Sequence, residues 1–223
     1  MYENVILIPF RKREEHLNYF IKNTVPLFKT YLPNSKVVVI EQEEGKLFNR
    51  GMLLNIGFNE YKDKTKYFFT HDVDMNPTED VVKLIYTNND IEVLRVKYIH
   101  DMCLGGIVKI KHNTIFDING FPNYIWGWGI EDRALYFRCR IKNINITNNN
   151  KQCFKVINHS SNAEVYTGEK KVISDIWSEQ NINKLNTEQQ NELIMSSGLN
   201  NLQYTIKEHK IIHEIVEVIT VSI

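Results

Sequence analysis

Three short, continuous apolar runs separated by helix-like segments constrain the fold of this chain most. The runs are residues 5–10, 36–41 and 66–70, and each is short and unbroken, as in a strand buried on both faces. Residues 14–30 and a segment beginning at Asn49 between these runs have helical spacing of their apolar side chains. Strand, helix, strand, helix, strand predicts an α/β fold with a mostly parallel twisted sheet wound with helices. Such sheets bind ligands beyond the carboxyl ends of their strands.

The rest of the chain continues this pattern. We expect strands near residues 93–96, 107–111 and 154–157, a helix after Thr78, a helix opening at Glu131, and a strand-like tail over residues 204–223. Residues 158–178 have weak periodicity, which predicts a long mobile loop. No repeat or linker divides the chain, so its 223 residues predict a single domain.

Charge and composition exclude several classes of protein. Lys and Arg together number 27 and so do Asp and Glu, giving a net charge of zero, whereas coating nucleic acid or an anionic membrane requires excess positive charge. The apolar runs are shorter than the roughly 20 residues that span a bilayer, and no secretion signal opens the sequence. Three widely spaced cysteines, Cys103, Cys139 and Cys153, form neither a disulfide framework nor a paired zinc knuckle.

Charged side chains follow each of the first three predicted strands. Arg11 and Arg13 follow the first, Arg50 lies in the turn after the second, and Asp72 and Asp74 follow the third. Guanidinium groups suit phosphates, and two carboxylates two residues apart suit Mg²⁺ or Mn²⁺. This arrangement predicts a site for a nucleoside diphosphate with a divalent metal. The alternative is a solvated turn, because such an Asp-x-Asp triplet is common.

A tryptophan and glycine segment, residues 126–130, is the most specific motif. A loop hinged at glycines can lay an indole against the apolar face of a sugar. Glu131 and Asp132 follow at the start of a predicted helix, where backbone N–H groups favour a charged carboxylate, and such a carboxylate beside a sugar suits a general base. The alternative is that Asp132 only caps the helix and Trp126 belongs to the core.

Two further features have both a functional and a structural interpretation. His159 follows a predicted strand and can reach a metal, although a lone histidine is more often structural. Gly105 and Gly106 precede the strand at residues 107–111. Two adjacent glycines allow a ligand to approach the backbone closely, or equally mark a bulge or tight turn.

The order of these motifs resembles that of the β-1,4-galactosyltransferases, a metal-dependent inverting glycosyltransferase family, family 7, with the GT-A fold. The matching segments are residues 8–11 with Arg13, His16 and Leu17, residues 48–50 and 53–58, Asp72 to Asp74 with Pro77, Gly105 and Gly106, residues 119–123, residues 126–129 with Glu131 and Asp132, His159, and residues 197–200 with Leu202 and Tyr204. The Trp-Gly-Trp-Gly segment with Glu131 and Asp132 is the most diagnostic part.

The resemblance implies a single GT-A catalytic domain that moves galactose or N-acetylgalactosamine from its UDP derivative to a sugar hydroxyl of a glycan acceptor, with inversion. Residues of about 1–110 would bind the nucleotide sugar and residues of about 111–223 the acceptor. The implied nucleotide-sugar residues are Pro9, Phe10, Arg11, Arg13, Phe48, Arg50, Asp72, Cys103 and Trp128. The implied acceptor residues are Gly106, Trp128, Glu131 and Asp132. Asp74 and His159 would bind Mn²⁺, with Mg²⁺ as the alternative, and Asp132 beside Glu131 would be the general base.

Three positions depart from the family pattern. Val156 stands where the vertebrate enzymes have a methionine that binds the metal, which puts metal affinity in question. Cys103 stands where a tyrosine usually crowds the 2-substituent of the donor, so UDP-N-acetylgalactosamine is a candidate donor. Arg133 reverses the sign of charge where many members continue the acidic run, which favours an acidic or otherwise unusual acceptor.

The sequence also has neither the membrane anchor nor the stem of the eukaryotic members. We therefore expect a cytoplasmic enzyme of bacterial or viral type, peripheral at most to a membrane-bound glycan assembly machinery. Two other functions compete with transfer. Val156 and Arg133 favour a catalytically silent glycan- or UDP-binding protein of the same fold. A metal-dependent phosphoesterase using Asp72, Asp74 and His159 would leave the tryptophan loop unexplained.

Overall fold

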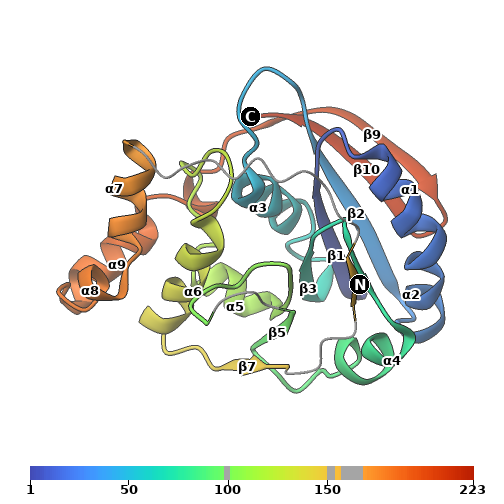
Figure 1. The fold of residues 1–223 in the computed structure, drawn as a ribbon, viewed down its shortest axis with the longest axis horizontal. Coiled ribbons are helices and arrows are strands. Elements are labelled where there is room, and N and C mark those ends of the chain that lie inside the picture. The colour runs from blue at the N-terminus through green and yellow to red at the C-terminus, as the bar shows by residue number, and fades with distance from the viewer. Residues whose placement is uncertain (98–100, 150–153, 157–167) are drawn as a thin grey trace.

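An eight-stranded sheet forms the centre of the computed structural model, which describes residues 1–97, 101–149, 154–156 and 168–223 (Figure 1). The order across the sheet is β7-β5-β6-β3-β1-β2-β10-β9. Its strands are β1 (Tyr2–Phe10), β2 (Ser35–Gln42), β3 (Thr65–His71), β5 (Val93–Lys97), β6 (Ile107–Lys111), β7 (Ile146–Asn148), β9 (Thr205–His213) and β10 (Val216–Ser222). A second sheet pairs β4 (Met75–Pro77) with β8 (Phe154–Val156).

The parallel part of the sheet is where the sequence predicted it. β1 pairs in parallel with both β2 and β3, and β10 pairs in parallel with β2. The flanks differ, since β6 is antiparallel to both β3 and β5, and β9 is antiparallel to β10. The tail forms this last pair because a short turn allows only antiparallel neighbours.

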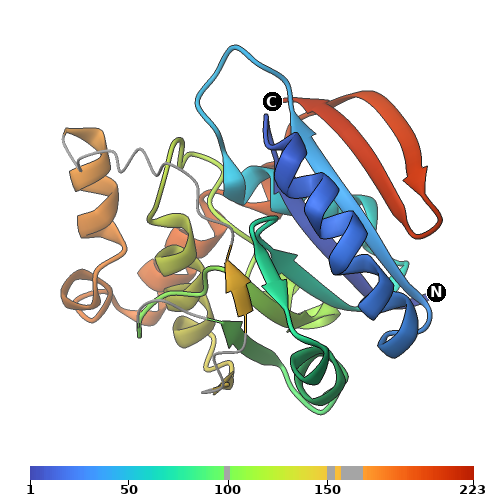
Figure 2. The same ribbon diagram turned by 45° about the vertical axis from the view of Figure 1, so that its right-hand side comes forward.

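Helices cover both faces of the sheet. The helices of the described residues are α1 (Glu14–Asn23), α2 (Val25–Tyr31), α3 (Arg50–Glu60), α4 (Glu79–Val81), the π-helical turn η1 (Val82–Tyr86), α5 (His112–Asp117), α6 (Glu131–Ile141), α7 (Glu169–Ile176), α8 (Glu179–Ile182), α9 (Thr187–Met195) and the 3₁₀ turn η2 (Leu199–Asn201). Ile6 and Ile8 of β1 belong to the same core cluster as residues of α1 and α2. In Figure 2, α1 lies across β1 on this face of the sheet. Val5 and Leu7 pack in a cluster with α3. Burial on both faces explains why the strand sequences are continuously apolar.

The segment 14–30, predicted as a single helix, is instead two helices that meet at Thr24. Pro26 lies in the first turn of α2. A proline has no N–H to donate to the preceding turn, so α1 does not continue through it. The prediction of one helix was therefore wrong at this point, although both segments are helical.

The predicted loop over 158–178 needs a larger correction. Residues 169–176 form α7, and Trp177 directly after it is fully buried. Trp177 packs in one cluster with Ile130, Ala134 and Phe137, so contacts with α6 hold the end of α7. The eight residues of α7 are themselves amphipathic, although the longer stretch around them has weak periodicity. Residues 158–167 of the same prediction lie outside the described residues. Figure 1 shows α7, α8 and α9 together at the end of the molecule beyond α6.

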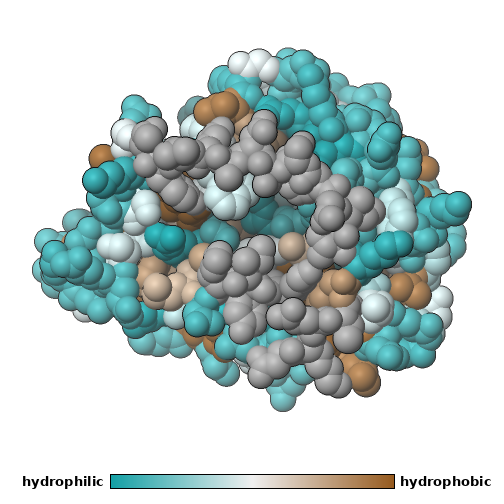
Figure 3. Space-filling view, viewed as in Figure 1, coloured by the Kyte–Doolittle hydropathy of each residue, from teal (hydrophilic) through white to brown (hydrophobic). Residues whose placement is uncertain are grey.

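One face of the molecule shows how polar and apolar residues are distributed at the surface. The described residues on the face drawn in Figure 3 are mostly hydrophilic, with hydrophobic residues scattered among them. Within the described ranges, none of the helices has the length and apolar character needed to cross a membrane.

Candidate active site

The carboxyl ends of β1 and β3 bring an arginine and an aspartate together. Arg13, three residues after β1, has its Nη1 3.3 Å from Oδ2 of Asp74, three residues after β3. Asp74 is buried and Arg13 is more exposed. β1 and β3 are parallel neighbours, so both end at the same edge of the sheet, as the sequence predicted. This edge forms the first part of the candidate site.

Arg50 joins the end of β3 to the start of α6. Its Nε and Nη2 donate to Oδ1 of Asp72 at 2.9 and 2.8 Å, and its Nη1 lies 3.8 Å from Oε1 of Glu131. Burial acts to lower the pKa of Arg50, but the charges of Asp72 and Glu131 outweigh it and raise that pKa above its ordinary value. One buried cation thus links the predicted donor side to the predicted acceptor side.

Glu131 is buried at the first position of α6, and its environment disfavours ionisation. Burial, reinforced by the charge of Asp132, raises the pKa of Glu131 to about 7 against the opposing charge of Arg50. In the described part of the chain, no hydrogen-bond partner reaches its Oε2. A carboxyl group with a pKa near neutral can take or give a proton at physiological pH.

Asp132 is fixed from two sides. Its Oδ1 accepts a hydrogen bond from the backbone N–H of Arg133 at 2.7 Å, and its backbone oxygen accepts one from Leu104 N at 2.9 Å. A Cβ atom added to Gly105 would lie 2.7 Å from Oδ2 of Asp132. The glycine that the sequence associated with ligand approach therefore makes room for the candidate base.

The loop before α6 has a backbone that few residues adopt. Gly127 and Gly129 have φ of +76° and +90°, and Ile130 has φ of +78°. A β-branched residue in this region is strained, and such strain is concentrated at functional sites. Trp128 between the glycines is 60% exposed, so its indole is available to a ligand and does not belong to the core.

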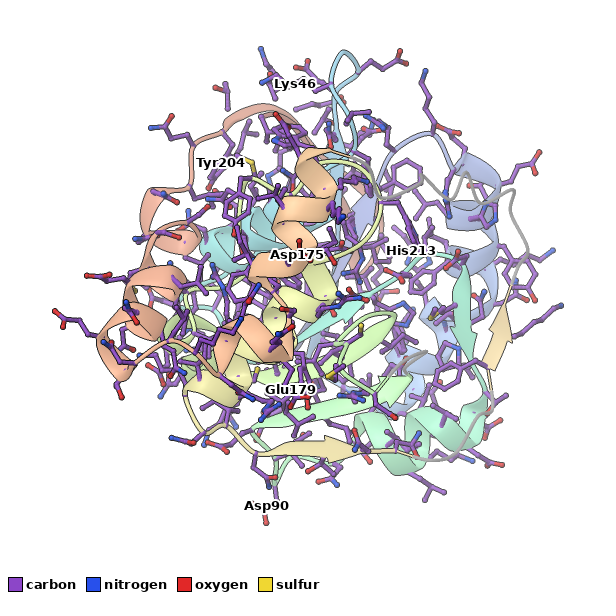
Figure 4. All side chains as sticks on the ribbon, turned by 60° about the vertical axis from the view of Figure 1, so that its left-hand side comes forward. Lys46, Asp90, Asp175, Glu179, Tyr204 and His213 are labelled. Carbon is purple, nitrogen blue, oxygen red and sulfur yellow. The ribbon has the colours of Figure 1, made fainter. Side chains whose placement is uncertain are left out.

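Two lysines that the sequence did not single out hold this loop in place. Lys170 of α7 donates through Nζ to the backbone oxygen of Trp128 at 2.8 Å. Lys46 lies 5.5 Å from the centre of the Trp126 ring, on the loop after β2 that Figure 4 shows at the top of the view. Lys46 follows a predicted strand and could have been suspected from that position. Lys170 gave no signal, because α7 was not predicted.

The residues expected to hold the uridine diphosphate come together next to this loop. Pro9 and Phe10 are buried at the end of β1. The guanidinium of Arg11 lies 5.3 Å from the centre of the Phe48 ring, and its Nη1 donates to Lys46 O at 2.6 Å. The backbone oxygen of Phe48 accepts from Gly127 N at 2.8 Å, so the predicted nucleotide residues and the tryptophan loop are neighbours.

Cys103 and Gly106 lie on the segment that joins Asp72 to Asp132. Burial and the charge of Asp132 raise the pKa of the Cys103 thiol to about 11, so it remains protonated near neutrality. Gly106 has φ of +71°, and its backbone oxygen accepts from Asp72 N at 3.3 Å. Both residues therefore lie on the stretch of chain that contacts Asp72 at one end and Asp132 at the other, and their roles in binding the donor and the acceptor stay predictions.

The chemistry of Asp74 fits a hard divalent cation, since carboxylate oxygen suits Mn²⁺ and Mg²⁺. The described residues contain no group of three metal-binding side chains. In the antiparallel pair of β4 and β8, Met75 is opposite Val156. Val156 is the last residue of β8, and Met75 directly follows Asp74, so the end of β8 lies close to Asp74 along the backbone. His159, the second expected ligand, lies outside the described residues.

Comparisons with known proteins agree with the motifs. The family model described as the N-terminal region of glycosyl transferase group 7 matches residues 1–87, and the model described as the N-terminal domain of galactosyltransferase matches residues 87–160. β-1,4-Galactosyltransferase 1 of Bos taurus is 31% identical over 214 residues, which are 91% of this chain and 50% of that protein. Human β-1,4-galactosyltransferase 4 is 33% identical over 152 residues, 64% of this chain and 44% of that protein. The chain thus spans about half the length of these relatives.

Solved structures confirm the expected GT-A fold. A crystal structure of a mutant Drosophila β-1,4-galactosyltransferase 7 in complex with manganese, UDP-Gal and xylobiose has a TM-score of 0.80 at 22% identity, covering 100% of this chain and 94% of that one. Glucosyl-3-phosphoglycerate synthase of Mycobacterium tuberculosis has a TM-score of 0.51 at 12% identity, covering 71% of this chain and 72% of that one.

One expectation was wrong. The matched relatives include proteins of human, Bos taurus and Drosophila melanogaster, which contradicts a cytoplasmic enzyme of bacterial or viral type. That expectation rested on the absence of an anchor before residue 1, and a stretch half as long as its relatives says nothing about what precedes it. The resemblance itself is confirmed: two adjoining models match residues 1–160, and this chain belongs to the glycosyl transferase group 7 family, that of the β-1,4-galactosyltransferases.

Proposed function

We propose that this chain transfers galactose from UDP-galactose to a hydroxyl group of a glycan acceptor, with inversion and with a divalent metal. The observation that carries the proposal is Arg50, which contacts Asp72 on the donor side and lies beside Glu131 on the acceptor side. A transferase must hold two substrates against each other, and a buried cation between the two carboxylates fixes their relative position. The relatives named β-1,4-galactosyltransferase support this choice of reaction.

The residues of the chain have separate tasks in this proposal. Arg11, Arg13 and Phe48 bind the nucleotide, while Asp72, held by Arg50, lines the donor sugar. Asp74, with His159, would hold the metal, which when bound supplies positive charge to the leaving diphosphate.

On the opposite side, Asp132 accepts the proton of the attacking hydroxyl group as the bond from its oxygen to the galactosyl carbon forms and the bond from that carbon to the diphosphate oxygen breaks, releasing UDP. Trp128, which is exposed on its glycine-hinged loop, covers the sugars and excludes water. Glu131, whose pKa is about 7, can hold a proton beside Asp132, so that the two carboxyls need not both be charged.

Calorimetric titration with UDP-galactose in Mn²⁺, Mg²⁺ or chelator tests the donor site. We expect binding that requires the metal and is lost in Asp74→Ala. Asp132→Asn should bind the donor normally and lose turnover, because the amide keeps the shape and removes the base. Asp63→Asn, a change at an exposed turn, is the control. Metal-independent binding, or full turnover in Asp132→Asn, would contradict these roles.

Two outcomes would favour the competing functions. Donor binding without transfer to any glycan would favour a silent binding protein. Release of free sugar and no acceptor product would favour a hydrolase.

The donor sugar itself depends on Cys103. We propose that its small side chain leaves room for a 2-N-acetyl group, so that UDP-N-acetylgalactosamine is a second donor. Its thiol lies close enough to Asp132 for that charge to raise its pKa, which supports a place beside the transferred sugar. Cys103→Tyr should shift the ratio of the two donors toward UDP-galactose, and an unchanged ratio would remove Cys103 from the donor pocket.

A further inference from the structure

Arg133 occupies a position where a cation is disfavoured. It is the third residue of α6, after Glu131 and Asp132, in the first turn of the helix. The positive end of the helix dipole favours carboxylates there and opposes a guanidinium. Across the described ranges, Arg133 forms no ion pair with a carboxylate that would offset this cost. A residue that breaks a local rule beside a candidate base suggests a functional reason.

The guanidinium is also held in a defined place. Its Nη1 donates to Oγ of Ser174 on α7 at 3.1 Å, and its charge acts to lower the pKa of the Cys103 thiol against the effects of burial and Asp132. Its own backbone N–H contacts Oδ1 of Asp132 at 2.7 Å. A guanidinium carries five N–H donors, and these contacts leave donors for a ligand. Arg133 therefore follows the proposed base directly in the chain, with its guanidinium held against α7.

The charged groups near Arg133 indicate which kind of acceptor its guanidinium would bind. Arg50 offsets the charges of Asp72 and Glu131, with which it pairs, but the carboxylate of Asp132, the proposed base, would repel an acceptor that carries a negative charge. A neutral acceptor needs no cation here. A guanidinium pairs with a carboxylate or a sulfate through two parallel hydrogen bonds, so Arg133 would allow an acidic acceptor to bind despite the carboxylate of Asp132.

We propose that Arg133 binds an anionic group of the acceptor sugar, a carboxylate or a sulfate ester, and that the acceptor of this enzyme is an acidic glycan. The inference rests on the proposed transferase function and names the substrate class of that site. The competing explanation is structural: through Ser174, Arg133 would serve only to join α6 to α7. The two differ because a purely structural role affects neutral and acidic acceptors equally.

The test compares kcat/KM for three aryl glycosides, the β-glucoside, the β-glucuronide and the β-glucoside 6-sulfate, at saturating UDP-galactose and Mn²⁺. We expect at least one charged acceptor to exceed the neutral one by about tenfold or more, as for a hydrogen-bonded charge pair. Arg133→Gln should abolish this ratio, and Arg133→Lys should retain part of it. Arg140→Gln is the control, because Arg140 lies on the same helix and pairs with Glu179 instead. The better of the two charged acceptors identifies the anion.

Ser174→Ala gives a second measurement that keeps the charge. It frees the guanidinium from α7 and should lower the acidic-to-neutral ratio less than Arg133→Gln does. Equal kcat/KM for charged and neutral acceptors in the parent protein would overturn the inference and leave the transferase intact. An equal loss on all acceptors in Arg133→Gln and Arg133→Lys would also overturn it. Absence of donor binding and of transfer to every acceptor would instead overturn the proposed function.

Discussion

Gly105 shows how a single residue can control a catalytic group that it does not itself provide. A methyl group at this position would lie 2.7 Å from Oδ2 of Asp132, so Gly105→Ala should push the carboxylate away from its place. We expect kcat to fall by about 10²-fold, as for small misplacements of catalytic groups, with unchanged affinity for UDP-galactose. Steady-state kinetics and calorimetry on the same preparation measure both. Unchanged kcat would mean that Asp132 moves freely or is not the base.

Glu131 predicts a pH dependence of stability. Folding raises its pKa from 4.5 to about 7, so the folded state binds this proton more tightly than the unfolded state, and the contribution of Glu131 to stability falls as the pH rises through this window. Relative to the parent, Glu131→Gln should therefore gain roughly 2–3 kcal/mol in unfolding free energy between pH 4.5 and pH 8. Urea unfolding at both pH values measures the gain. A constant difference between the two proteins would show that Glu131 ionises normally.

At the scale of elements, local signals predicted where helices begin and tertiary contacts decided the rest. Asn49 was expected to open a helix, and its side chain caps α3 by accepting from Met52 N at 2.9 Å. The strand boundaries of β2 and β3 likewise lie within one residue of their apolar runs. The prediction missed α7 because the helix has only eight residues, whose amphipathic pattern is lost in the weak periodicity of the longer stretch 158–178. A helix this short depends on tertiary packing, here of Trp177 with α6, which the sequence does not record.

Removing Asn49, the cap of α3, should lower the free energy of unfolding by more than the loss of a helix cap alone. Asn49 is fully buried and also donates to Asn123 O at 2.8 Å. Asn49→Ala should cost about 2–3 kcal/mol, because it removes the cap and leaves the partly buried carbonyl of Asn123 without this partner. Asn186→Ala removes an exposed cap of α9 and should cost about 1 kcal/mol or less. Denaturant unfolding of both variants measures the difference, and equal losses would contradict the tertiary role of Asn49.

At the scale of the whole molecule, ligand binding should stabilise the fold by mass action. The site collects residues from β1, β3 and α6, which separate on unfolding, so UDP with Mn²⁺ binds only the folded state. At a hundredfold excess over Kd the gain is about 2.7 kcal/mol, or roughly 5–10 °C in Tm for a chain of this size. Thermal unfolding with and without chelator measures it.

Two variants separate the metal from the nucleotide in that measurement. Asp74→Ala should lose the part of the Tm increase that depends on Mn²⁺, whereas Asp63→Asn should keep it. The same increase in the presence of chelator would contradict a metal-dependent site.

The sequence alone determined the parallel centre of the sheet, the strand ends that carry Arg13 and Asp74, and the start of α6 at Glu131. These depend on apolar periodicity, caps and glycines, which act between residues near each other in the chain. Only the tertiary structure decided that Arg50 contacts Asp72, 22 residues away, and approaches Glu131. It also decided the raised pKa of Glu131 and the contact of Arg133 with α7. Burial and the pairing of charges arise only when distant segments pack together.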